Sequence, residues 1–170
     1  MIQLDEMHTI VAMKQDNVPV GMEHLDDIGE MWIFAAIDPV SRLVPCVHVG
    51  KRDQVNTTLF INEIASRTKN HVRICTDGAN SYIPIIAEEF GADVDYGQIV
   101  KKFVTEKELS GEQRYERPAR MVEVKRRVIF GKMEKGEISN AHIESFNNLI
   151  RTYLLRTART CNAHSKLLKN

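Results

Sequence analysis

Cysteine is scarce in this sequence, which has only Cys46, Cys75 and Cys161 among its 170 residues. The number is odd, the three positions lie far apart, and neither a Cys-x-x-Cys pair nor a zinc-ligand spacing occurs. A disulfide-stapled fold and a structural zinc site are therefore not expected. The three thiols are typical of reduced cysteines in an intracellular protein.

Long apolar runs are also missing. No stretch of 18 or more apolar residues occurs, and the N-terminal residues MIQLDEMH lack the basic and apolar regions of a signal peptide. Apolar residues make up 43% of the chain and charged residues 27%, which is ordinary globular usage. We therefore expect a soluble, cytoplasmic protein without a membrane partner, folded as a single domain over residues 1–170.

The chain also has no net charge, but its acidic and basic residues are distributed unevenly along the sequence. Residues 1–100 carry 7 Lys and Arg against 15 Asp and Glu, whereas residues 101–170 carry 16 against 8. A basic segment of this kind indicates a surface that can bind nucleic-acid phosphates, because Lys and Arg displace counterions from the backbone. An ordinary solvated surface is an equally good interpretation of the charge alone.

Hydrophobic periodicity predicts an alternation of strands and helices. The expected order is strand, a hairpin of two strands, helix, strand, helix, strand, basic connector and helix, and no internal repeat interrupts it. We expect strands at 3–11, 31–38, 43–50, 71–77 and 92–103, and helices at 52–68, at 78–91 and after an N-cap at Ser139. This is the order of an RNase H-like α/β domain with a five-stranded mixed sheet flanked by helices.

Three acidic residues fall where this arrangement can bring them together. Asp5 lies within the first strand, Asp77 ends the fourth, and Glu144 lies one turn into the last helix. Carboxylates grouped at one edge of the sheet suit two Mg²⁺ or Mn²⁺ ions, which can stabilise the attacking and leaving oxygens of a phosphodiester. Glu6 competes with Asp5, since alternation sends the two to opposite faces. For Asp38 we expect a turn-forming role instead.

Other side chains near these acids are candidates for binding DNA. Asn140, Asn147, Asn148 and Arg151 share the helix face of Glu144, while Ile143, Phe146 and Ile150 face the core. Lys125, Arg126 and Arg127 form the densest basic cluster, which is also explained by a solvated loop.

The segments LDEMHTIV, MWIFAAIDPVSRLVPCVHVG, ICTDGANSY, YGQIVKKF and NAHIESFNNLIRTYLLRTART follow one another in this order. Together they resemble the catalytic domain of the DDE transposases of bacterial insertion sequences, and the insertion-sequence-one type most closely. The resemblance covers nearly the whole chain. It implies that Asp5, Asp77 and Glu144 are a catalytic, metal-binding triad.

This resemblance implies a DNA transposase that cleaves transposon ends and transfers them to target DNA with Mg²⁺ or Mn²⁺, acting on double-stranded DNA in the bacterial cytoplasm as a homodimer. Such proteins also carry an N-terminal DNA-recognition segment, which we expect this chain to lack. Two alternatives remain open: an RNase H-like nuclease or resolvase, and a truncated, non-catalytic product that binds DNA or inhibits full-length subunits.

Overall fold

The computed structural model describes residues 1–22, 25–104, 120–154, 157 and 166–168. Its elements follow the predicted order, with one strand added after the last predicted one. They are β1 (Ile2–Val11), η1 (Gln15–Asn17), β2 (Gly29–Ile37), β3 (Cys46–Gly50), α1 (Gln54–Arg67), β4 (Val72–Asp77), α2 (Tyr82–Phe90), β5 (Val94–Val104), β6 (Arg120–Phe130), η2 (Lys135–Glu137) and α3 (Ala141–Tyr153).

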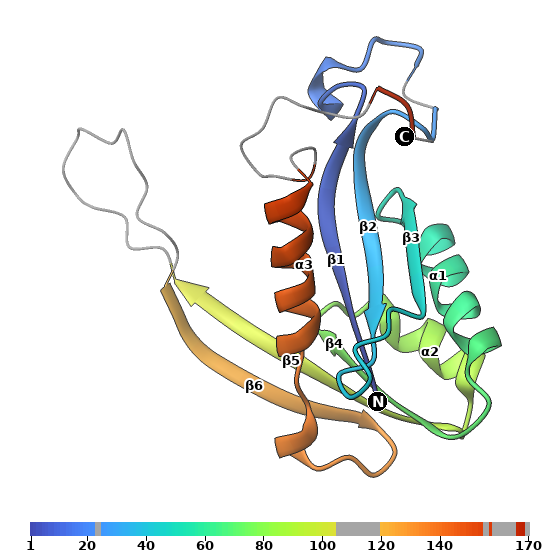
Figure 1. The fold of residues 1–170 in the computed structure, drawn as a ribbon, viewed down its shortest axis with the longest axis vertical. Helices are drawn as coiled ribbons and strands as arrows, with labels where there is room; N and C mark the ends of the chain where they lie inside the picture. The colour runs from blue at the N-terminus through green and yellow to red at the C-terminus, as the bar shows by residue number, and fades with distance from the viewer. Residues whose placement is uncertain (23–24, 105–119, 155–156, 158–165, 169–170) are drawn as a thin grey trace.

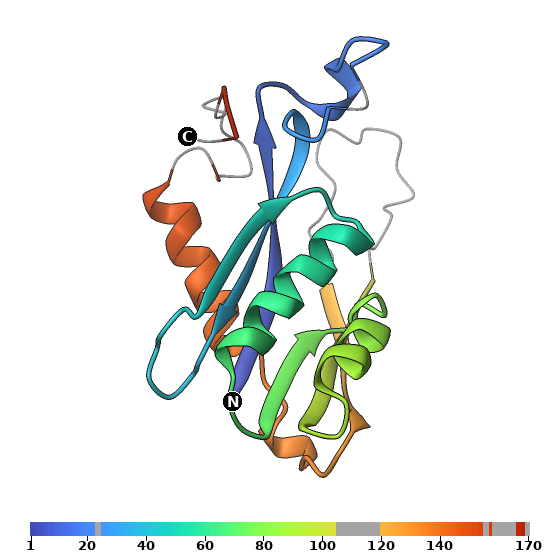
Figure 2. The ribbon, with the colours of Figure 1, turned by 90° about the vertical axis from the view of Figure 1, so that its right-hand side faces the viewer.

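One mixed sheet organises the described residues. Its strand order is β3-β2-β1-β4-β5-β6, so β1 lies in the interior of the sheet. The pairs β1–β4 and β4–β5 are parallel, and the other three neighbouring pairs are antiparallel. Helices α1 and α2 cover one face and α3 crosses the other (Figures 1 and 2). The prediction of an α/β domain with a mixed sheet flanked by helices is confirmed.

The predicted strand number of five is wrong, because β6 adds a sixth strand along the edge of β5. The segment 105–136 shows no clear period, and only a β-rich run at 122–130 hints at this strand. As an edge strand β6 is exposed along most of its length. Without a buried side, its sequence lacks the alternation that marks a half-buried strand.

The main core lies between the sheet and the two helices α1 and α2. Leu4 of β1, Phe34 of β2, Phe60 of α1 and Ile74 of β4 are all fully buried there. Pro84 lies in the first turn of α2, where a missing N–H is tolerated, as predicted. Tyr82, which we expected to be a core residue more often than a DNA contact, is 1% exposed and belongs to this core.

Asp38 holds the connection between β2 and β3. Its Oδ1 accepts a hydrogen bond from the Val40 amide at 3.2 Å, and its Oδ2 accepts bonds from the amide and hydroxyl of Ser41 at 3.2 and 2.7 Å. These bonds to charged oxygens lower the pKa of Asp38, the Ser41 hydroxyl most strongly. The predicted hairpin and the turn-forming role of Asp38 are both confirmed.

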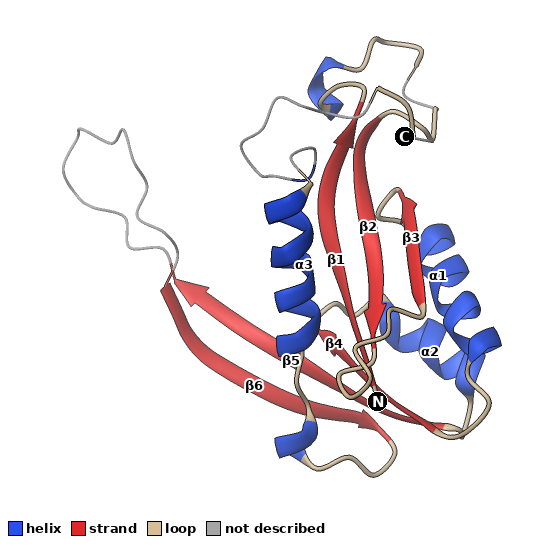
Figure 3. Cartoon of the chain, in the orientation of Figure 1, coloured by secondary structure: helices blue, strands red, loops and turns tan. Residues whose placement is uncertain are grey.

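The strands β5 and β6 continue as a two-stranded ribbon beyond the rest of the sheet (Figure 3). Strand β4 pairs with residues 94–99 of β5, whereas β6 pairs with β5 as far as Val104. Phe103, Met121 and Val122 on this ribbon are each about half exposed, at 54%, 50% and 53%. None of the helices in the described part of the chain is long and apolar enough to cross a membrane.

Candidate functional site

The register of two parallel strands brings Asp5 beside Asp77. Gln3 of β1 pairs with Cys75 of β4, and Asp5 and Asp77 each follow two residues later. Because side chains alternate along a strand, both carboxylates lie on the sheet face that α3 crosses. The prediction that the first and fourth strands are neighbours, with both aspartates at the same end, is confirmed.

The surroundings of Asp5 raise its pKa. Burial is the largest effect and raises the pKa of Asp5 to about 6. The negative charges of Asp77 and Glu144 add to the rise, while hydrogen bonds from the Glu6 amide and Asn147 oppose it. The carboxylates of Asp77 and Glu144 are thus near enough to Asp5 to affect its charge, and the role of the three acids as metal ligands stays a prediction.

Gln3 positions the helix that carries Glu144. Its side chain is 1% exposed, and its Oε1 accepts hydrogen bonds from the amides of His142 and Ile143 at 3.0 and 3.1 Å. These amides belong to the first turn of α3, where helical N–H groups have no partner within the helix. Gln3 thus satisfies two donors that the helix itself cannot satisfy and ties α3 to β1.

The beginning of α3 differs by one residue from the prediction. Asn140, not Ser139, is the N-cap residue, and it makes no capping bond through its side chain. The Ser139 hydroxyl accepts a bond from the Ala141 amide at 3.3 Å instead. A cap supplied from β1 by Gln3 makes a local side-chain cap unnecessary.

Asn147 joins α3 to the first aspartate. Its Nδ2 donates a 2.8 Å hydrogen bond to Oδ2 of Asp5, and the residue is 2% exposed. The Oδ1 atom of the same amide is buried and accepts no hydrogen bond from a described residue. A buried carbonyl oxygen without a donor is unfavourable, and a cation is a suitable partner for it.

Lys101 of β5 reaches the same site. Its ammonium forms a salt bridge with Oε1 of Glu144, and the two side chains are 28% and 40% exposed. The strand register explains the contact: Asp77 pairs with Ile99, and Lys101 follows two residues later on the same face. This lysine cannot be found from the sequence alone, because its contact with Glu144 depends on the pairing of β4 with β5.

Glu6 lies on the opposite face of β1, where its carboxylate is 5% exposed and bonds Nε of Arg52 at 2.5 Å. The guanidinium of Arg52 also stacks on Trp32, 4.5 Å from the ring centroid. Between the two candidates for the first position, the geometry therefore groups Asp5, and not Glu6, with Asp77 and Glu144.

The turn after β4 holds Asp77 in place. Its Oδ1 accepts a bond from the amide of Ala79 at 3.1 Å. A Cβ atom on Gly78 would lie 3.0 Å from Cγ2 of Val100, so glycine allows the turn to approach β5 closely.

The predicted DNA-binding residues are divided between the interior and the surface. Asn140 and Asn147 are 6% and 2% exposed and have roles within the fold, while Asn148 is exposed and Arg151 is half-buried. His142, expected beside the site or on the surface, contacts Arg42 through Nδ1. Arg156 lies outside the described residues.

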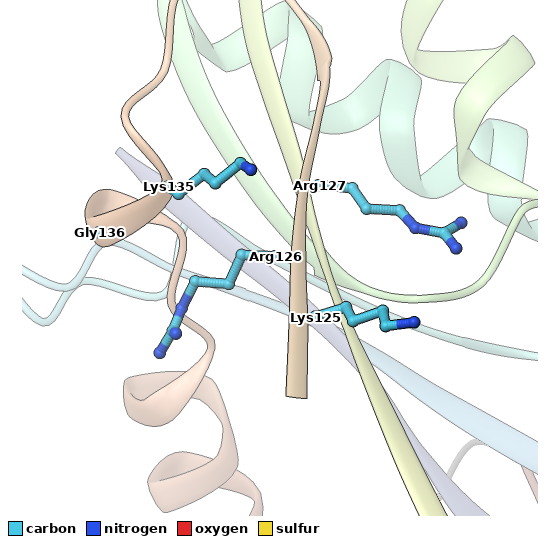
Figure 4. A pocket seen from close by; sticks show the side chains of 5 residues that line it. All are labelled: Lys125, Arg126, Arg127, Lys135 and Gly136. Atoms are coloured by element: carbon cyan, nitrogen blue, oxygen red, sulfur yellow. The ribbon is translucent and has the colours of Figure 1, made fainter. Parts of the chain in front are cut away.

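The basic cluster at 125–127 belongs to β6, not to a loop. Arg126 extends to one side of the strand, where its Nε donates a 3.0 Å bond to the carbonyl of Ile138, while Lys125 and Arg127 extend to the other side (Figure 4). Nζ of Lys125 also lies 3.3 Å from Oε1 of Glu123. Together with Lys135 these side chains line an open hollow. The cluster therefore lies on a strand and not in the expected connector, and its role in binding phosphate stays a prediction.

The donor set at Asp5 suits a hard divalent cation. Three carboxylates and the unpaired Asn147 oxygen are the ligand types that Mg²⁺ and Mn²⁺ prefer. In the described residues no three His, Cys, Asp or Glu side chains are close enough to hold a metal together. The salt bridge with Lys101 engages Glu144 in this arrangement. The types of side chain present fit a cation, but the described residues do not form a group of three ligands in this arrangement.

Comparison with known proteins gives no family for the chain. No protein-family model matches it, and no curated protein or solved structure matches it either.

Proposed function

We propose that this chain is the catalytic domain of a divalent-metal-dependent DNA transposase with an RNase H-like fold. The observation that carries the proposal is the position of Asp5 beside Asp77 on neighbouring strands, with Glu144 on the helix that crosses the same face of the sheet (Figure 1). The strand order, with β1 flanked by antiparallel β2 and parallel β4, supports it. So does the ordered series of motifs around the three acids.

In this proposal the three carboxylates hold two Mg²⁺ or Mn²⁺ ions. Bound ions would activate a nucleophilic oxygen and stabilise the charge that develops on the phosphodiester. Asn147 orients Asp5 through its 2.8 Å hydrogen bond, and Gln3 holds α3 so that Glu144 faces the aspartates. Asn148, Arg151, Lys125 and Arg127 are the candidates for binding DNA phosphates. Two chains would act together, because a mobile element has two ends.

The test uses Asp77→Asn and Glu144→Gln, with Glu88→Gln on the exposed face of α2 as the matched control. Each protein is incubated with Mg²⁺, supercoiled plasmid and a labelled duplex that has a free 3′ hydroxyl. We expect the wild type and the control to nick the plasmid and join the duplex to it, and both site variants to lose both activities. Full activity in the site variants would remove the assignment of the triad.

The same assay separates the alternatives. An RNase H-like nuclease or resolvase has the same need for carboxylates and would nick without joining the labelled duplex. A non-catalytic, inhibitory product would retain the duplex in a binding assay without nicking the plasmid, and it would reduce the activity of a full-length transposase added to it.

A further inference from the structure

Lys101 is a cationic side chain that contacts Glu144 of the triad directly. It lies on β5 two residues after Ile99, which pairs with Asp77, and its ammonium bonds Glu144 on α3. Lys101 therefore joins β5, the strand next to Asp77, to α3, the helix that carries Glu144. Its side chain is 28% exposed, so its charge is less screened than that of a surface lysine.

We propose that Lys101 is a built-in counter-ion that keeps the site open while no divalent cation is bound, by drawing Glu144 away from Asp5 and Asp77. A divalent cation then competes with the ammonium for Glu144, and the complete ligand set forms only when Glu144 leaves Lys101. The inference rests on the proposed function in one respect, namely that the three carboxylates bind a cation.

The first argument is electrostatic. Asp5 and Asp77 lie side by side on neighbouring strands, and their negative charges would repel a third carboxylate beside them. A nearby ammonium offsets part of this repulsion at the position of Glu144. Lys101 is thus a positioning residue, which acts through Glu144.

The second argument is the spacing of the potential ligands. Lys101 holds Glu144, Asn147 holds Asp5, and Asp77 bonds the Ala79 amide. Each acid therefore has a partner of its own, and the described residues contain no preformed group of three acids around one point. The Oδ1 atom of Asn147 remains buried and unpaired beside them. A site with this unused oxygen is one that a cation can complete.

The experiment measures Mn²⁺ binding to the whole chain by titration calorimetry, without DNA. Lys101→Met removes the charge and keeps an unbranched side chain, whereas Lys101→Arg keeps the charge. Lys102→Met is the matched control, because Lys102 is the adjacent, exposed lysine on the opposite side of β5. Glu144→Gln identifies binding at the site itself.

We expect Lys101→Met to bind Mn²⁺ about fivefold more tightly or better, since it removes a partner that competes for Glu144. Lys102→Met and Lys101→Arg should stay within about twofold of the wild type, a difference below 0.5 kcal/mol. Without Mn²⁺ the Lys101→Met variant should unfold at a lower temperature than the wild type, and saturating Mn²⁺ should remove most of this difference.

The two proposals fail in different ways. If the wild type binds Mn²⁺ in a Glu144-dependent manner and Lys101→Met leaves the affinity unchanged or weaker, the role of Lys101 is overturned and the cation site stands. Equal tightening by Lys101→Arg also overturns it, because the charge would then be irrelevant. If neither the wild type nor Lys101→Met binds Mn²⁺ at millimolar concentration, the cation site itself is overturned.

Discussion

Asn147 of α3 donates a 2.8 Å hydrogen bond to Asp5 of β1, across 142 residues of sequence. Asn147→Leu removes this donor at nearly constant volume and leaves the buried carboxylate with one partner fewer. We expect a loss of about 1 to 3 kcal/mol in the free energy of unfolding, and a further rise in the pKa of Asp5, which this bond lowers. Urea denaturation measures the first effect.

Asn148→Ala is the control for this change, because Asn148 is the next residue on the helix and is exposed. Its effect should stay within about 0.5 kcal/mol. Equal losses in the two variants would show that the amide of Asn147 has no special role in joining the helix to the sheet.

The stability of the metal-free protein should depend on the protonation of Asp5. Its pKa is raised from 3.8 to about 6 in the fold, so the protonated form stabilises the folded state. This contribution is complete below about pH 4 and is lost as the pH rises through about 6. Asp5→Asn is neutral at every pH. We therefore expect it to exceed the wild type by about 1 to 3 kcal/mol near pH 7.5 and to equal it near pH 4.

Denaturation in the presence of EDTA at these two pH values checks the prediction. Asp16→Asn, an exposed change in η1, should show no such difference between them. If Asp5→Asn is less stable than the wild type at neutral pH, then burial and neighbouring acids do not destabilise the ionised carboxylate.

Gln3→Met should loosen the beginning of α3. The variant keeps the size of the side chain but loses the acceptor for the amides of His142 and Ile143. We expect a loss of roughly 1 to 3 kcal/mol in stability, and faster hydrogen exchange at these two amides. Gln54→Met, on an exposed position of α1, serves as the control. Unchanged exchange at His142 and Ile143 would contradict the capping role of Gln3.

Asp5 and Glu6 should differ sharply in Mn²⁺ binding. Asp5→Asn should weaken binding by more than the roughly tenfold typical of outer-shell partners. Glu6→Gln should leave the affinity nearly unchanged, because Glu6 faces Arg52 on the other side of the sheet. It should instead reduce stability, since it weakens an ion pair whose carboxylate is buried. Titration calorimetry of both variants decides between the two acids, and a large loss of affinity in Glu6→Gln would reverse the assignment.

Local pattern was sufficient to predict most elements, whereas the joint role of the three acids stays a prediction. The apolar run at 31–38, the turn at Asp38 and the TDG segment at the end of β4 depend on neighbouring residues, and the structure has them as predicted. The position of Asp5 opposite Glu6 follows from strand alternation alone. Tyr153 is the last residue of α3 and is 76% exposed, so it does not extend the apolar face of the helix.

Gln3 and Lys101 could not be found in this way, because their roles depend on register. Gln3 accepts hydrogen bonds from amides 139 and 140 residues away in the sequence. Lys101 is placed on the face of Asp77 by the pairing of Asp77 with Ile99. One observation could have pointed to Gln3, which stands two residues from Asp5 along β1 and so shares its face, whereas Lys101 has no residue of the triad on its own strand. Strand β6 was not predicted for a different reason. An exposed edge strand can form without alternating apolar and polar side chains, so its sequence lacks that signal.

The contact of Gln3 with the first turn of α3 also limits the order in which the protein can fold during its synthesis on the ribosome. The strands β1 to β4 can pair while the chain is still being synthesised. Gln3 can accept its hydrogen bonds from the amides of residues 142 and 143 only after these residues have been synthesised. Until then Asp5 and Asp77 lack both the helix and its glutamate. In a growing chain the first four strands can therefore pair before the helix that carries Glu144 exists.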